Sequence, residues 1–190
     1  MNVNTARICC CKARRLFPPS AGPVYTFAPD GAWAACVSRS GSGVVIHDAT
    51  GQPRAKLPGL WTDLDTSPDG RWLLAAGHTG YCLWDAASWR PVFEAAQQTA
   101  DRFFAIHSFS RDGTTLALRT TDDTVTLYRL PDGQPLRQLT LPSRLLVRGL
   151  ALTRNARKLY VLSTGFRLHC WDLDALDAEL RHLGLARPGE

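Results

Sequence analysis

The chain has 190 residues, of which 45% are hydrophobic and 21% charged, an ordinary composition for a globular protein with its own core. Its 22 Lys and Arg against 17 Asp and Glu give a formal net charge of +5, but the basic residues are spread along the whole chain. Phosphate binding needs positive charge gathered on one face, so this pattern argues against a nucleic-acid partner.

Residues 1–22 are expected to form an irregular leader. They contain four basic residues but no apolar run of roughly seven residues, so neither a signal peptide nor a membrane helix is expected, and we expect the protein in the reducing cytoplasm. Three consecutive cysteines, Cys9, Cys10 and Cys11, cannot all serve one tetrahedral metal site, because metal ligands are usually separated by other residues. The segment 7–11 is extended in character and could supply an outer strand.

From residue 23 onward, two short motifs recur at a period of about forty residues. A turn centred on Asp-Gly is followed about sixteen residues later by Trp-Asp or a variant of it. A fixed period of this length is typical of one supersecondary unit that is copied along the chain and stacked on its neighbours. The turns are Pro29-Asp30-Gly31, Pro68-Asp69-Gly70, Arg111-Asp112-Gly113 and Arg154-Asn155-Ala156, and the second motifs are His47-Asp48, Trp84-Asp85, Tyr128-Arg129 and Trp171-Asp172.

Each copy predicts three strands in the same order. The first strand alternates in hydropathy and ends before the Asp-Gly turn, the second is apolar on both faces, and the third follows a polar turn. A strand that is apolar on both faces is buried on both faces, so these sheets must be covered from two sides. Short fourth strands beside prolines fit the outer edge of each sheet, where a missing backbone donor is tolerated. The expected strands are 24–27, 33–37, 44–47 and 54–56, then 63–66, 72–76, 81–84 and 92–94, then 106–109, 116–118, 125–128 and 136–140, and finally 149–152, 159–162 and 168–171.

The chain is expected to end in a short amphipathic helix, over 174–183, instead of a fourth strand of the last sheet. Leucines recur at steps of three and four residues, which places them on one helical face. Acidic residues stand in the first turn, basic residues in the last, and Gly184 stands where a left-handed cap is expected. The leucine face should pack on the last sheet and cover its open edge or flank. These leucines are Leu173, Leu176, Leu180 and Leu183.

The repeat resembles the blades of bacterial WD-repeat β-propellers. The residues that carry this resemblance are the Asp-Gly turns, each followed by an apolar strand and then by Trp-Asp or a relic of it, over about residues 24–173. The stretch that begins with Trp171-Asp172 also resembles the tail of planctomycete-type WD-repeat proteins. The resemblance implies an all-β fold: a β-propeller segment of about four four-stranded antiparallel blades with a short C-terminal α-helix. The implied blades are 23–61, 62–103, 104–146 and 147–173, followed by a helix and tail over 174–190. Trp84 and Trp171 should then be equivalent and largely buried.

The number of blades does not decide whether the propeller closes into a ring. Rings of this family usually contain six to eight blades, so four blades make an arc with two apolar flanks, and such flanks attract a partner. Three arrangements follow: the chain is a part of a longer propeller, two copies complete one ring, or four blades tighten into a small ring by themselves.

Neither an enzyme nor a cofactor is expected. The pairs with acid-base potential are adjacent in sequence, and adjacent strand residues point to opposite faces, so they do not converge on a substrate. These pairs are His47 with Asp48, His107 with Ser108, and Asp122 with Asp123. Three cysteines within strands, Cys36, Cys82 and Cys170, are expected to be small buried hydrophobic residues.

Binding is expected on one rim. In a propeller, the loops that join one blade to the next lie on the same rim as the turns between the second and third strands. Trp and Arg, which are enriched at interface hot spots, occur in these loops. Trp61 and Phe104 occupy the same position of the repeat, and the alternative for both is that they pack between blades. The candidate partner-binding residues are Trp61, Arg102, Phe103, Phe104 and Arg148.

The sequence therefore favours a non-catalytic WD-repeat scaffold for protein–protein interaction. The expected partner is a protein or peptide, with self-association through the open flanks as a further mode, and no membrane contact is expected. The alternative is a truncated or degenerate C-terminal propeller piece of a larger bacterial signalling protein, a kinase or sensor, without independent activity.

Overall fold

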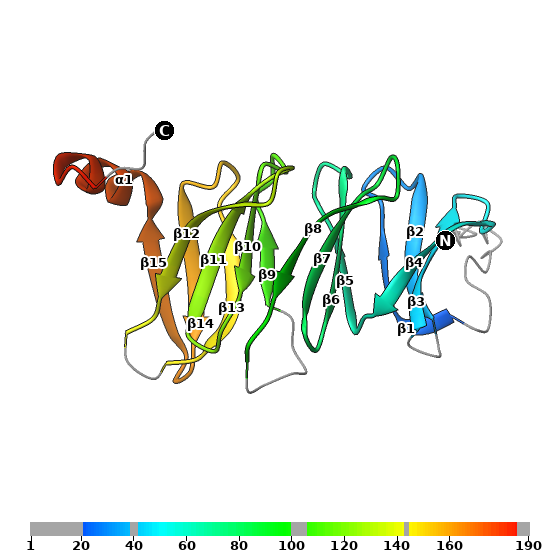
Figure 1. Ribbon diagram of the computed structural model, residues 1–190, viewed down its shortest axis with the longest axis horizontal. Coiled ribbons are helices and arrows are strands. Elements are labelled where there is room, and N and C mark those ends of the chain that lie inside the picture. Colours follow the sequence, from blue (N-terminus) through cyan, green and yellow to red (C-terminus); the bar gives the residue numbers. More distant parts are fainter. Residues whose placement is uncertain (1–20, 39–41, 100–105, 143–144, 186–190) are drawn as a thin grey trace, which may run out of the picture.

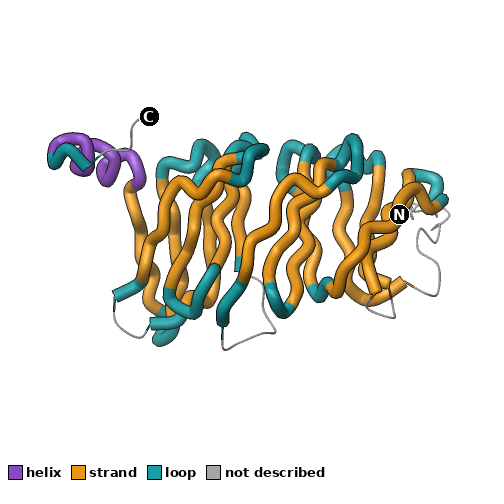
Figure 2. Tube along the Cα trace, viewed as in Figure 1, coloured by secondary structure: helices purple, strands orange, loops and turns teal. Residues whose placement is uncertain are grey.

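The computed structural model describes residues 21–38, 42–99, 106–142 and 145–185. In this part of the chain, four antiparallel β-sheets stand side by side in a row, with one helix at the end of the row farthest from the first sheet (Figure 1 and Figure 2). The all-β class and the short C-terminal helix are confirmed. Repeated sheets of this kind are consistent with a β-propeller-like repeat fold.

The strands follow one another within each sheet in sequence order, so each sheet is a meander. The segment 7–11 lies outside the described residues, and the first strand begins at Ala21, slightly before the expected start of the first repeat at residue 23. Sheet 1 consists of β1 (Ala21–Phe27), β2 (Trp33–Ser38), β3 (Ser42–Asp48) and β4 (Pro53–Leu60), and sheet 2 of β5 (Asp63–Thr66), β6 (Trp72–Gly77), β7 (Gly80–Asp85) and β8 (Pro91–Ala96). Sheet 3 consists of β9 (His107–Phe109), β10 (Thr115–Arg119), β11 (Thr124–Arg129) and β12 (Gln134–Thr140), and sheet 4 of β13 (Val147–Leu152), β14 (Lys158–Ser163) and β15 (Arg167–Asp172).

The hydrophobic cores lie between the sheets. On the two middle strands of a sheet, side chains alternate between two faces. The forward face points toward the following sheet in the chain, and the backward face points toward the preceding sheet. Each core joins the forward face of one sheet to the backward face of the next. The forward faces contain Ala35, Val37, Val44 and Ile46 in sheet 1, Leu74, Ala76, Tyr81 and Leu83 in sheet 2, and Ala117, Val125 and Leu127 in sheet 3. They meet backward faces that contain Leu73, Ala75, Cys82 and Trp84 in sheet 2, Leu116 and Leu118 in sheet 3, and Leu159 and Val161 in sheet 4.

The Asp-Gly turns have one conformation in all four sheets. Gly31, Gly70 and Gly113 have φ values of 73°, 76° and 68°, and Ala156, at the same position of the fourth turn, has a φ of 53°. This left-handed region is open to glycine but costs energy for a residue with a Cβ. In each turn the residue donates its N–H to the carbonyl three residues earlier, so the fourth copy keeps the turn geometry after losing the glycine.

Trp84 and Trp171 occupy equivalent positions, as expected. Trp84 of β7 pairs with Leu73, and Trp171 of β15 pairs with Leu159, each three residues after the turn position. Trp84 is buried, whereas Trp171 is half-buried, so the expected burial is wrong for Trp171. The reason is that β7 is covered along its outer edge by β8, while no described strand pairs with the outer edge of β15.

Helix α1 spans Leu173–His182, one residue earlier at each end than expected, and is followed by the left-handed glycine that the sequence predicts. Asp172 is the N-cap, and its side chain accepts a hydrogen bond from the backbone N–H of Ala175 at 3.0 Å. Gly184 follows the helix with a φ of 68° and donates its N–H to the carbonyl of Arg181 at 3.1 Å. The chain therefore turns helical directly after β15, where the other sheets add a fourth strand.

The helix docks on the core between sheets 3 and 4. Leu173 is buried and Leu176 half-buried against this core, and Asp177 forms an ion pair with Arg137 of β12. It does not cover the forward face of sheet 4, because Leu162 and Leu168 on that face remain exposed. The helix therefore docks on the last sheet, as expected, but the alternative that it covers the open flank is wrong. Leu173 and Leu176 pack on an existing interface instead, while Leu183 is exposed.

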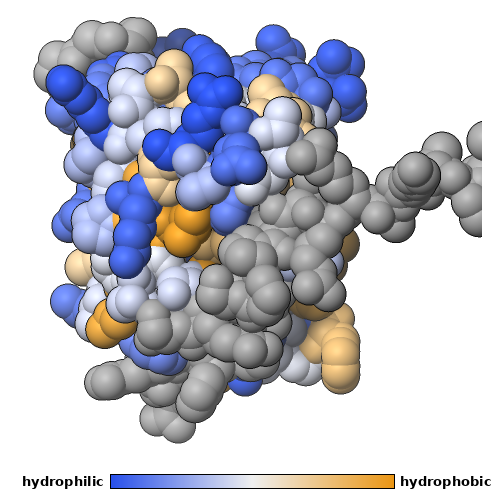
Figure 3. Space-filling view, turned by 90° about the vertical axis from the view of Figure 1, so that its right-hand side faces the viewer, coloured by the Kyte–Doolittle hydropathy of each residue, from blue (hydrophilic) through white to orange (hydrophobic). Residues whose placement is uncertain are grey.

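The row of sheets does not close on itself. The four sheets do not close into a ring, so the small four-bladed ring is wrong for this structure (Figure 1). At one end, Cys170 on the forward face of sheet 4 is exposed, unlike the buried Cys36 and Cys82, because none of the described sheets packs on it; the expected burial is wrong for Cys170. At the other end, apolar side chains gather in the middle of the outward face of sheet 1, with hydrophilic ones around them (Figure 3).

The docking of the helix can be tested at Leu176. Leu176→Asp places a charge in the half-buried contact with the core between sheets 3 and 4, and we expect it to lower the free energy of unfolding by about 1–2 kcal/mol. Leu183→Asp makes the same change at an exposed position after the helix and should cost less than about 0.5 kcal/mol. Urea denaturation of both variants measures the difference. Equal midpoints for the two variants would contradict the docking.

Candidate functional site

The expected binding rim is formed by the loops between sheets and the turns between second and third strands. In the described residues, this rim includes the β4–β5 loop with Trp61, the end of the β12–β13 connection, and the β14–β15 turn. Arg102, Phe103 and Phe104 lie outside the described residues, so their predicted place on the rim stays a prediction. Trp61 and Arg148 can be examined individually.

Trp61 serves the packing between sheets 1 and 2. Its ring is half-buried against the core between these sheets, and its Nε1–H donates to the carbonyl of Pro58 at 2.7 Å. The ring lies so close to Gly59 that a Cβ at that position would clash with it. Trp61 therefore packs between neighbouring sheets, which was the alternative expectation. The part of its side chain that stays exposed still lies on the rim.

Arg148 lies within β13, not in the loop before it. It is exposed, at a register shift between Val147 and Gly149 where β13 departs from regular pairing with β14. Hydrogen bonds in both directions between Leu146 and Thr164 hold the β14–β15 turn beside the start of β13. The guanidinium of Arg148 is thus carried on a strand end that borders the rim.

Phe166 is a rim residue that the sequence pattern missed. It lies in the β14–β15 turn, where 93% of the residue is exposed, and its φ of 57° places it in the left-handed region. An aromatic residue in this region is strained, and its exposed ring adds little to the core. Leu60, at the end of β4, is also 74% exposed on this rim. The available signal for Phe166 was an aromatic residue directly after Gly165 in an otherwise polar turn.

Hydrogen bonds between the first strands of neighbouring sheets hold these sheets together along one edge. The Nε2 atom of His107 in β9 lies 3.0 Å from a carboxylate oxygen of Asp65 in β5. Ser108, the next residue, accepts the backbone N–H of Leu152 in β13 at 3.0 Å. These neighbours point to opposite sheets, as the alternation of strands predicts, so they do not form a common catalytic site. The Thr26 and Thr66 hydroxyls make a third contact of this kind, at 3.0 Å.

His47 and Asp48 are also separated by the strand. His47 is buried; its Nδ1 lies 3.2 Å from the carbonyl oxygen of Gly51 and its Nε2 lies 3.7 Å from the sulfur of Cys36. Burial raises the pKa of the Cys36 thiol, which disfavours the reactive thiolate. Asp48, the last residue of β3, instead holds the turn that follows, where a hydrogen bond from Thr50 contributes most to lowering its pKa. The arrangement serves the fold of sheet 1.

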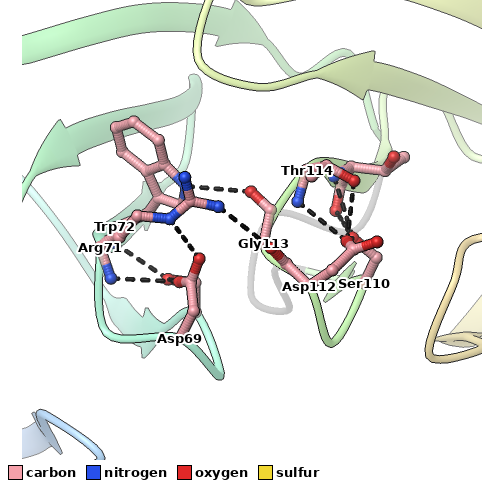
Figure 4. Close-up of polar contacts among 9 residues, drawn as sticks. Asp69, Arg71, Trp72, Ser110, Asp112, Gly113 and Thr114 are labelled. Atoms are coloured by element: carbon pink, nitrogen blue, oxygen red, sulfur yellow. Dashed lines mark hydrogen bonds and ion pairs between the residues drawn. The ribbon is translucent and has the colours of Figure 1, made fainter.

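The opposite rim carries a polar network between the Asp-Gly turns of sheets 2 and 3 (Figure 4). Asp69 accepts hydrogen bonds from Ser67 and from Arg71 within its own turn. The guanidinium of Arg71 also reaches the carbonyl oxygen of Asp112 in the next turn, at 3.0 Å. Asp112 is held by its own turn, in which Ser110 and Thr114 donate to its carboxylate. The two turns are therefore fastened to each other.

Trp72 adds a buried contact to this network. Its Nε1–H donates to the carbonyl of Gly113 at 3.0 Å, between β6 of sheet 2 and the turn of sheet 3 (Figure 4). Trp84, on the neighbouring strand β7, is similarly buried, but its Nε1 finds no hydrogen-bond partner among the described residues. The two indoles thus form a matched pair that differs in one hydrogen bond.

This pair predicts unequal costs for the same substitution. Trp72→Phe removes the donor to Gly113 and leaves a buried carbonyl unsatisfied, whereas Trp84→Phe removes a donor that makes no bond. We expect Trp72→Phe to lower the free energy of unfolding by about 1–3 kcal/mol more than Trp84→Phe does. Chemical denaturation compares the variants. A larger loss for Trp84→Phe would show that indole packing, not the hydrogen bond, dominates.

The turn carboxylates predict a pH dependence of stability. Burial alone would raise the pKa of Asp69, but the hydrogen bonds from Ser67 and Arg71 outweigh it and hold this pKa below its ordinary value. A lowered pKa in the folded state stabilises the fold above the unfolded value of about 4, and this contribution is lost as the pH falls through the folded value. Asp69→Asn should therefore lower the melting temperature by about 2–4 °C at pH 7, and this difference should shrink below about pH 4.

Asp30 offers the matched control. It occupies the same turn position in sheet 1, where its carboxylate accepts the backbone N–H of Ala32 at 2.9 Å but has no arginine beside it in the turn. Asp30→Asn should change the melting temperature by less than Asp69→Asn at pH 7. Melting curves at several pH values would contradict the assignment if both variants lost equal stability at every pH.

Comparison with known proteins gives no match: no protein-family model and no curated protein matches the chain. Within the described segments, no group of three or more His, Cys, Asp or Glu side chains could hold a metal ion. The single helix found there is too short to cross a membrane.

Proposed function

We propose that this chain is a non-catalytic, WD-repeat-like scaffold that binds a protein or peptide through one rim. The surface, called the partner rim, comprises Leu60, Trp61, Arg148 and Phe166, and the proposal extends it to Arg102, Phe103 and Phe104 by sequence. The observation that carries the proposal is Phe166, whose ring is exposed and whose backbone is strained.

The Phe166 side chain contributes little to the fold. A phenylalanine at positive φ costs stability that glycine would not, and a ring in water gains little by packing. A residue that is costly to the fold and open to a partner is a candidate binding residue. Arginine and aromatic residues together are the types that carry most binding energy in protein interfaces, and Arg148 borders the same turn.

The residues with acid-base potential support a binding role in preference to catalysis. His107, Ser108 and Asp65 make hydrogen bonds between sheets, and His47 lies buried within sheet 1. Each makes a contact that holds strands or sheets in place, and Ser108 points away from the His107–Asp65 pair toward sheet 4.

The test uses a variant that separates binding from folding. Phe166→Gly, combined with Arg148→Ala, should weaken partner binding by about 30-fold or more, the effect of losing a hot spot worth ~2 kcal/mol. The glycine should leave the melting temperature unchanged or raise it, because glycine adopts positive φ without strain. Partners are identified by quantitative affinity capture from the cells that express the protein, and their affinity for purified wild type and variant is then measured.

The matched control removes two exposed arginines from the opposite rim, with Arg90→Ala and Arg111→Ala. This variant should bind the captured partner as the wild type does. A partner whose affinity is unchanged by the partner-rim substitutions, or reduced equally by the control, would contradict the proposal.

A further inference from the structure

The outer edge of β15 is where sheet 4 differs from the other three sheets. In sheets 1 to 3, the third strand pairs on its outer side with a fourth strand, β4, β8 or β12. Sheet 4 has three strands among the described residues, so no described strand pairs with the backbone groups on the outer side of β15. Helix α1 begins only after β15 and lies at its end, not along its edge (Figure 1). An edge of this kind is a template for one more antiparallel strand.

The side chain of Leu168 marks the same difference. It is 67% exposed, whereas the residues at the corresponding position of the other third strands are at most 2% exposed. These positions correspond because each pairs with the same position of the second strand; they are Val44, Tyr81 and Val125. In sheets 1 to 3, a buried apolar residue of the fourth strand lies directly opposite: Leu57, Ala95 and Leu139. An apolar side chain opposite Leu168 would complete the pattern that the other three sheets share.

The fourth strands of sheets 1 to 3 also indicate which residues precede this apolar one. The residue directly before it is polar and exposed in each strand, and it pairs with the position that His169 has in sheet 4: Lys56, Glu94 and Gln138. One residue earlier, Phe93 of β8 pairs with Leu83 and packs on the core. Cys170 has the position of Leu83 in sheet 4. An added strand would therefore read apolar, polar and apolar opposite Cys170, His169 and Leu168.

Arg167 sets the charge of the next position. It is the first residue of β15, is exposed, and forms no ion pair within the described part of the chain. The residues opposite the corresponding position of sheets 2 and 3, Ala96 and Thr140, are uncharged. A carboxylate at this position would lie beside the guanidinium of Arg167, and opposite charges on paired strands attract each other. Residues 1–20 contain four basic residues and no Asp or Glu, so that segment lacks the charge that would pair with Arg167.

We propose that the outer edge of β15 binds an extended segment of a partner protein, which adds as the fourth strand of sheet 4. Because this segment runs antiparallel to β15, its sequence reads apolar, polar, apolar and acidic from its N-terminal to its C-terminal end. Hydrogen bonds between the two backbones hold the segment, while Leu168 and Arg167 select its side chains. The site uses the edge of a strand, whereas the partner rim uses the turn before it, so either site can fail without the other.

The experiment uses a fluorescently labelled synthetic peptide copied from residues 91–98, which contain β8, with Ala95→Leu and Ala96→Glu. Fluorescence anisotropy measures its affinity for the full chain. Two further peptides carry N-methyl groups on alternate residues, one at positions 93 and 95 and the other at positions 94 and 96. In an antiparallel pair, only one of these two sets of N–H groups points toward the partner strand. The unmethylated peptide should bind saturably, and only one of the methylated peptides should lose affinity, by at least tenfold.

Variants of the chain test the two side chains. Leu168→Asp should weaken binding at least fivefold, because it removes the apolar contact and repels the acidic peptide. Arg167→Glu should weaken it by about fivefold, and a peptide with Lys at position 96 should recover this loss. Arg111→Glu, the same change at an exposed arginine on the opposite rim, should leave the affinity unchanged. Circular dichroism and melting curves confirm that the variants fold, and sedimentation velocity measures the mass of the chain.

Four results would overturn the proposal. A wild-type chain that does not bind the peptide would show that the edge does not accept such a strand. Equal affinities of the two N-methylated peptides would show that binding does not use strand pairing. An equal loss in Arg111→Glu and Arg167→Glu would indicate general attraction between charges. A wild-type dimer that dissociates on Leu168→Asp would assign the edge to a second copy of this chain.

Discussion

The packing of apolar sheet faces on one another is the constraint from which the rest of the structure follows. The middle strands are apolar on both sides, so a single sheet has no stable state in water with both faces exposed. The row of sheets satisfies this requirement for six of its eight faces, as three shared cores. The remaining two faces lie at the ends, and their residues are of the same types as those inside the row.

Polar contacts fix the position of one sheet relative to the next, which apolar packing alone does not. Trp72 reaches the turn of the next sheet, His107 reaches the preceding first strand, and Tyr81 donates its hydroxyl to the carbonyl of Arg119 at 3.0 Å. Apolar surfaces alone would allow one sheet to slide on another, whereas a buried hydrogen bond is costly to break. Residues that look suited to chemistry in the sequence are therefore used to set the positions of the sheets.

The surface proposed for recognition lies on turns, loops and strand ends beside the cores. Phe166 can change without disturbing the sheets, because its exposed ring is not part of a core, whereas Trp61 also packs between sheets 1 and 2.

The repeat pattern determined the all-β class, the order of strands, the equivalence of Trp84 and Trp171, and the helix after Trp171-Asp172, because alternation, glycine turns and helix caps are local properties of the chain. Tertiary structure alone decided which faces are covered. Cys170 has the sequence signature of a buried residue but lies on the uncovered face of sheet 4, and Trp171 lies beside an outer edge that no described strand covers. Leu173 and Leu176 of α1 pack on an existing core. Tertiary structure also decided that Trp61 packs between sheets while Phe166 points into water. The reason is physical: hydropathy records which side chains gain from burial, but the neighbour that buries them comes from residues distant in sequence, and at the ends of a repeat that neighbour is missing.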